Sequence, residues 1–143
     1  MNLPEKILAK INSHAEKGNN FIDNEQYDSA IAEWSKALDI LPEPKNDWEA
    51  YAWLSASIGD ALYHKKAYRL AAISFLNSLN APGGTENPFV HYRLGQCYIL
   101  LEDESSGVEA LLKAYMLDGE EIFLEESDGI TFLNILRDKD LVD

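Results

Sequence analysis

The sequence predicts an all-α protein, a solenoid of three helix–turn–helix repeats closed by one more helix. Three observations lead to this prediction. One pattern of small and aromatic residues recurs three times along the 143 residues, loops containing proline and glycine separate the copies, and an amphipathic stretch follows the third copy. A chain of this length can bury one sizeable core, so we expect a single domain over residues 1–143.

The recurring pattern is most complete in its first copy. Gly18 and Phe21 fall on a first helix, and a second helix carries Tyr27, Ala30, Trp34, Ala37 and Leu38 before Pro42. The same frame recurs at Gly59 and at Gly95, although the third copy has Gly107 where the others have alanine and lacks the closing proline. This spacing resembles the tetratricopeptide repeat (TPR). The resemblance implies a TPR α-solenoid with repeats at about 11–44, 52–85 and 88–121, followed by a capping segment at 122–143.

Close packing between the two helices of a repeat explains the pattern. Gly18, Gly59 and Gly95 leave room for the facing helix, and the aromatic residues fill the space around each contact. We therefore expect these glycines to belong to the core. None of them lies in a GxGxxG or GxxxxGK[ST] motif, so they do not predict a phosphate-binding loop.

Capping and breaking residues place the ends of the helices. Asp47 and either Thr85 or Asn87 are suited to begin helices, Pro88 suits a first turn, and Ser127 is placed to cap the last helix. That last helix has an apolar stripe of Ile130, Phe132, Leu133, Ile135 and Leu136, and would cover the open end of the array. Seven helices are predicted, at about 4–24, 27–40, 47–64, 68–80, 88–101, 105–117 and 128–137.

The chain is strongly acidic. Twelve Lys and Arg face twenty-five Asp and Glu, a formal net charge of -13, and residues 101–143 alone contribute -10. Such a surface repels nucleic acid and anionic membranes and favours a basic protein or peptide as partner. The alternative is that the charge serves solubility alone.

The TPR resemblance implies a concave groove lined by the first helix of each repeat. Trp53, Tyr63, Phe89 and Tyr92 fall at groove positions that the repeat core does not require to be aromatic, so we expect them to anchor a partner. The alternative for each is packing against the N-terminal extension or a neighbouring helix. Asp23 and Asp60 would accept a Lys or Arg of the partner. The predicted groove also includes Asn19, His64 and Gln96.

One known TPR function is not predicted. The carboxylate clamp of chaperone-binding TPR proteins needs particular Lys, Asn and Arg residues at five positions. Two of the five match in this chain, where the positions hold Ala15, Asn19, Ser57, Phe89 and Arg93.

The acidic run from Asp118 to Asp128 offers a more specific hypothesis. It holds six acids and no base, and it resembles the tail of small stand-alone bacterial TPR proteins, some of which are toxin-immunity proteins. An acidic inhibitor would suit the basic site of a nuclease-like toxin. The alternative is a solvated linker whose acids favour the dipole of the following helix.

No catalytic chemistry, cofactor or metal is predicted. His14, His64 and His91 fall on different helices, HExxH and GxSxG are absent, and Cys97 is the only cysteine. Without a secretory signal or a long apolar stretch, the cytoplasm is the expected location. We therefore predict a non-catalytic interaction module that binds a protein partner in its groove. The alternative is a self-associating structural or adaptor/chaperone subunit of a bacterial complex, for example a homodimer formed through Trp48, Trp53 and the exposed face of the last helix.

Overall fold

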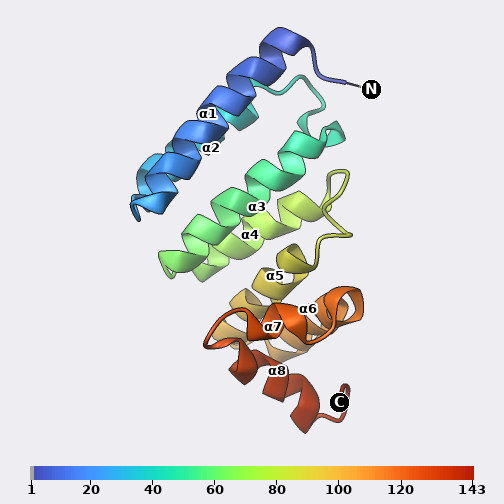
Figure 1. The fold of residues 1–143 in the computed structure, drawn as a ribbon. Coiled ribbons are helices and arrows are strands. Elements are labelled where there is room, and N and C mark those ends of the chain that lie inside the picture. Colours follow the sequence, from blue (N-terminus) through green and yellow to red (C-terminus); the bar gives the residue numbers. More distant parts are fainter. Residues whose placement is uncertain (1) are drawn as a thin grey trace.

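The computed structural model describes residues 2–143, and within them the secondary structure is helical with no strand. Three antiparallel helix pairs follow one another along the chain: α1 (Glu5–Asp23) with α2 (Tyr27–Ile40), α3 (Glu49–His64) with α4 (Tyr68–Leu79), and α5 (Pro88–Leu100) with α6 (Glu104–Asp118). A short α7 (Glu121–Leu124) and then α8 (Gly129–Asp138) complete the fold. The pairs stack in order, with the N-terminus near one end and the C-terminus near the other (Figure 1). The predicted all-α TPR solenoid is confirmed.

The glycine at the middle of each first helix faces the same residue position of the second helix. A Cβ built on Gly18 would lie 2.3 Å from Trp34 Nε1, and one on Gly95 would lie 2.7 Å from Leu111 Cδ2. In the middle repeat, Gly59 stands in the same relation to Phe75, at 2.9 Å from Cζ. These distances leave no room for a side chain on the glycine. The same close contact therefore joins the two helices within each of the three repeats.

A second shared feature is the turn inside each pair. Glu25, Lys66 and Glu102 each adopt a left-handed backbone, with φ of 58°, 65° and 65°. Around Glu25, the Gln26 N–H donates to Phe21 O and the Glu25 N–H donates to Ile22 O, and the other two turns repeat both bonds. This is the Schellman arrangement that satisfies the last carbonyls of a helix. Here it is formed without glycine.

Some predicted helix ends differ in the structure. Asp47 does not cap α3: it ends a one-turn 3-10 helix, η1 (Lys45–Asp47), and α3 begins at Glu49 after Trp48. Ser127 does not cap α8, which begins two residues later at Gly129. Asn87 does cap α5, since its Oδ1 accepts a hydrogen bond from Phe89 N at 3.0 Å. The short helix α7 was not predicted.

The core consists of three clusters of buried side chains, and the first two each join one repeat to the next. Phe123 of α7 and Phe132, Leu133 and Leu136 of α8 join Leu111 in the third cluster, so the C-terminal segment covers the end of the array. No helix within residues 2–143 is both long enough and apolar enough to cross a membrane.

Candidate partner-binding groove

Trp53 is the exposed aromatic residue of the predicted groove. Its side chain is 42% exposed although it lies on α3, where most neighbours are buried. It lines a cavity of about 670 Å³, whose lining residues are Asn2, Leu3, Glu5, Leu8, Asp47, Trp48, Glu49, Ala50, Trp53 and Pro82. It also lines a second cavity, of about 240 Å³, whose lining residues are Glu49, Ala52, Trp53, Ser78, Pro82, Gly83, Gly84 and Asn87. We call these two cavities together the Trp53 cleft.

The cleft combines an apolar floor with acidic edges. Leu3, Leu8 and Trp48 supply apolar surface beside the Trp53 ring. The charged residues that line the cleft are Glu5, Asp47 and Glu49, and no Lys, Arg or His is among its lining residues. A cationic side chain with an apolar stem or neighbour matches this combination.

The loop that forms one wall of the cleft is fixed by hydrogen bonds. Lys45 Nζ donates to three carbonyls at the end of α2, those of Leu38, Asp39 and Leu41, at 3.0 to 3.2 Å. Trp48 Nε1 donates to Pro42 O at 2.9 Å. A cationic side chain at a helix C-terminus is electrostatically favourable. The hydrogen bonds of Lys45 and Trp48 together fix the loop that carries Asp47 and leads to Glu49.

The middle of the groove is occupied by Arg93, which is 4% exposed. Its guanidinium donates two hydrogen bonds to the Glu126 carboxylate, both at 2.7 Å, and Nε donates to Asp60 Oδ1 at 2.8 Å. A fourth bond runs from Nη1 to Gln96 Oε1 at 2.9 Å. The guanidinium carbon lies 4.4 Å from the centre of the Tyr63 ring, within cation–π range.

Burial and the charges of this Arg93 cluster together shift the pKa values of its members. The hydrogen bonds from Arg93 lower the pKa of Glu126, and burial raises the pKa of Tyr63 to about 12. Burial and the nearby Glu126 carboxylate raise the pKa of Tyr92. Burial opposes the charge on Arg93, but its hydrogen bonds to Glu126 and attraction to Asp60 outweigh this and raise its pKa. The cluster therefore consists of a charged arginine between two carboxylates, with tyrosines that stay neutral at pH 7.

Three predicted groove residues are engaged inside the protein. Tyr92 is 1% exposed and donates its hydroxyl to Glu126 Oε1 at 3.1 Å, and Gln96 is fully buried beside Arg93. Asp60 accepts from Arg93, with His64 Nε2 3.5 Å away. The expectation that Tyr92 and Gln96 line an open groove is wrong, because both side chains are buried: Tyr92 is bonded to Glu126 of the segment after α7, and Gln96 is bonded to Arg93. Asp60 is 31% exposed and already accepts a hydrogen bond from Arg93, so its role as acceptor for a partner's cation stays a prediction.

The other predicted residues lie partly at the Arg93 cluster and partly away from it. Tyr63 and Phe89 are half-buried against Arg93, and the guanidinium carbon lies 5.1 Å from the centre of the Phe89 ring. The His64 ring stacks on Tyr27 at 6.0 Å. Asn19 and Asp23 are exposed on α1 and share no recorded hydrogen bond or ion pair with the rest of the groove. The structure thus brings together Asp60, Tyr63, His64, Phe89, Tyr92 and Gln96, and leaves Trp53 apart from them.

The sequence does not predict two sets of residues that are important to the groove. Its patterns indicate Arg93 only as a clamp residue and Glu126 only as one acid of the run from Asp118 to Asp128. A signal existed, since Arg93 is the one cation among predicted groove-helix residues 88–101 and would need a carboxylate once buried. The acidic edge of Glu5, Asp47 and Glu49 gave no signal, because it is assembled from three separate segments.

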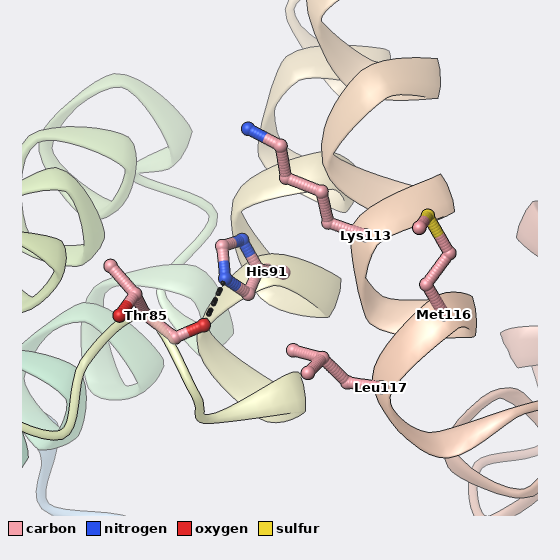
Figure 2. A pocket seen from close by; sticks show the side chains of 5 residues that line it. All are labelled: Thr85, His91, Lys113, Met116 and Leu117. Carbon is pink, nitrogen blue, oxygen red and sulfur yellow. Dashed lines mark hydrogen bonds between the residues drawn. The ribbon is translucent and has the colours of Figure 1, made fainter.

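A further cavity, of about 320 Å³, lies away from the groove, between the loop before α5 and the end of α6. Figure 2 shows its lining: Thr85, His91, Lys113, Met116 and Leu117. His91 is buried and its Nε2 lies 2.9 Å from Thr85 O, so this histidine secures the loop. It packs within the protein. Among residues 2–143, no group of three or more His, Cys, Asp or Glu is arranged to hold a metal ion.

Comparison with solved structures agrees with this architecture. No family model matches the chain, and no curated protein matches its sequence. The fold is that of the TPR proteins. The first TPR of Spaghetti (RPAP3), solved bound to the HSP90 peptide SRMEEVD, has a TM-score of 0.71 at 16% identity and covers 92% of this chain and 97% of its own. The crystal structure of MamA has a TM-score of 0.71 at 15% identity, covering 92% of this chain and 69% of its own.

Proposed function

We propose that the protein is a non-catalytic interaction module that binds an extended basic segment of a partner protein in the Trp53 cleft. The observation that carries this proposal is Trp53 itself, a 42% exposed tryptophan that lines two cavities whose charged lining residues are all acidic. Exposed tryptophans are frequent anchors of binding energy. Lysine or arginine next to an apolar residue is the chemistry that such a cleft recognises.

An acidic peptide of the kind bound by the Spaghetti domain is not the ligand we propose. Arg93, the one clamp cation present, already holds Glu126 and Asp60. The remaining clamp positions include Ala15, Ser57 and Phe89, none of which carries positive charge.

Peptide binding tests the proposal. The probes are ten-residue labelled peptides with a central Leu or Phe flanked by Lys or Arg, and matched peptides flanked by Glu, followed by fluorescence anisotropy. We expect the basic peptides to bind more tightly, and Trp53→Ala to weaken them by about tenfold or more, as loss of one anchor does. The matched control is Met116→Ala, an apolar residue 77% exposed and outside the cleft. Equal binding of basic and acidic peptides, or full binding by Trp53→Ala, would refute the proposal.

The more specific proposal is that the partner is a basic toxin and the protein its inhibitor. The net charge of -13 supports electrostatic attraction to such a partner. Co-expression with the product of the adjacent gene provides the test: growth arrest by that product alone, relieved by this chain and not by its Trp53→Ala variant, is expected. Absence of toxicity from any neighbouring product would exclude the inhibitor role while leaving peptide binding intact.

Self-association through Trp53 and the last helix is the alternative function. It is favoured by the same exposed Trp53 and by Ile130 of α8, which is 39% exposed. Trp48 contributes less, because it is half-buried and hydrogen-bonded to Pro42. A dimer that dissociates on Trp53→Ala would support this alternative over a cleft that is free for a partner.

A further inference from the structure

The outer face of α4 is apolar and exposed. Leu70, Ile73 and Leu76 are 56%, 50% and 41% exposed. Their spacing of three residues makes them neighbours on the helix surface, and they lie opposite the buried Ala71 and Phe75. None of the three lines the Trp53 cleft. This surface is left without an explanation by the function proposed above.

The charge of this region is unlike that of the rest of the chain. Residues 61–85 contain no Asp or Glu, and residues 61–101 hold four Lys or Arg against the single acid Glu86. Lys65 is paired with Asp28 of α2, whereas Lys66 and Arg69 have no ion-pair partner among residues 2–143. In a protein of net charge -13, α4 is therefore a face that another acidic chain can approach at little electrostatic cost.

The stripe is also complementary to itself. If a second α4 runs antiparallel over the first with Ile73 on the two-fold axis, helix geometry sets Leu70 of each copy against Leu76 of the other. The same geometry sets Arg69 against Asn77, whose side-chain oxygen can accept a hydrogen bond. The cationic ends of the two helices then lie apart. We propose that α4 is the interface of a symmetric dimer of this chain, with the cleft of each copy left open.

Salt distinguishes this dimer from other assemblies. Two chains of net charge -13 repel one another, and added salt screens that repulsion, so dimerisation through an acid-free apolar face should strengthen with salt. A contact between the cations of α4 and the acidic C-terminal third of another copy would weaken with salt instead.

Sedimentation velocity from about 5 µM to about 500 µM, at about 0.05 M and about 0.5 M NaCl, tests the proposal. The expected result is a dimer at high concentration that is more populated at high salt. Ile73→Glu places a carboxylate on the axis and should raise the dissociation constant at least about tenfold, while Met116→Glu, also at an exposed apolar position, should leave it unchanged. A wild type that stays monomeric, a dimer retained by Ile73→Glu, or a dimer that weakens with salt would overturn the proposal.

A cross-linking experiment adds a positional test. Cys97 is the only native cysteine and is buried, so Ile73→Cys introduces a single accessible thiol. On the two-fold axis, the two copies of this thiol should form a disulfide under mild oxidation at high protein concentration. Met116→Cys should not. Trp53→Ala should leave the dimer unchanged, so failure of the α4 dimer and failure of cleft binding are observed separately.

Discussion

The replacement of Glu126 by glutamine tests how the Arg93 cluster holds the C-terminal segment over the groove. Glu126 accepts two hydrogen bonds from Arg93 and one from Tyr92, and the segment that carries it has no other recorded side-chain hydrogen bond to α5. The Glu126→Gln side chain keeps one oxygen acceptor and loses the negative charge. Arg93, 4% exposed, would then keep Asp60 as its only carboxylate.

The size of the effect follows from the exposure of the pair. Removing one partner of a fully buried ion pair costs about 3–5 kcal/mol. Glu126 is 33% exposed and Asp60 remains bound, so we expect a smaller loss in the free energy of unfolding, about 1–3 kcal/mol. For a chain of this length, each kcal/mol corresponds to a fall in Tm of about 2–4 °C. Urea denaturation at pH 7 measures the free energy directly.

The pH dependence identifies the carboxylate as the cause. Hydrogen bonds from Arg93 lower the pKa of Glu126 in the folded protein below its ordinary value of 4.5. A carboxyl group with a lowered folded-state pKa stabilises the protein fully above its unfolded pKa, and this stabilisation is lost as pH falls through the folded pKa. The difference in unfolding free energy between wild type and Glu126→Gln should therefore narrow below about pH 4.5.

A neighbouring carboxylate provides the matched control. Glu125 is exposed and has no recorded hydrogen bond or ion pair, so Glu125→Gln should change the free energy of unfolding by less than about 0.5 kcal/mol. Equal stability of the two variants would refute the structural role of Glu126. A loss in Glu126→Gln that stays constant down to low pH would show that its cause is not the carboxylate charge.

Two further substitutions test the repeat architecture. Glu102→Gly should stabilise the protein by about 0.5–1 kcal/mol in urea denaturation. Glycine removes the strain of a left-handed residue, and only part of that gain is lost to its greater unfolded-state entropy. The control Glu109→Gly, inside α6, should destabilise the protein, and destabilisation by both variants would contradict the turn geometry. Gly18→Ala should lower Tm with a loss of about 1–3 kcal/mol, because its Cβ would overlap the Trp34 ring. Full stability of Gly18→Ala would mean that the helices can separate freely at this contact.

The repeats could be predicted because their defining contact is local. Gly18 and Trp34 belong to one helix pair, so their fixed spacing in the sequence translates directly into a contact in space. The turns at Glu25, Lys66 and Glu102 gave no such signal, since non-glycine residues adopt the left-handed conformation there. The sequence pattern therefore predicts which helices pair, but not the turn geometry between them.

The groove could be predicted only in part, because its closure depends on a distant segment. Arg93 and Glu126 are 33 residues apart, on either side of α6, and their pairing depends on α7 turning the chain back. At that turn, Gly129 lies so close to Phe123 O that a Cβ would stand 1.7 Å from it. Groove positions assigned from the repeat alone take no account of such a segment, so Tyr92 and Gln96 were expected to be open.

The closed Arg93 cluster keeps its own cation from acting on a ligand. Asp60 and Glu126 offset the charge of the buried Arg93, so no positive charge from Arg93 is available to an acidic peptide. The Trp53 cleft lies apart from this cluster, and its own charged lining residues are all acidic, which supports the proposed preference for a basic segment. Opening the cluster would expose Arg93 to the groove, and acidic peptides would gain a site there. Glu126→Gln should consequently narrow the preference for basic over acidic peptides, whereas Trp53→Ala should weaken the binding of basic peptides without creating any binding of acidic ones.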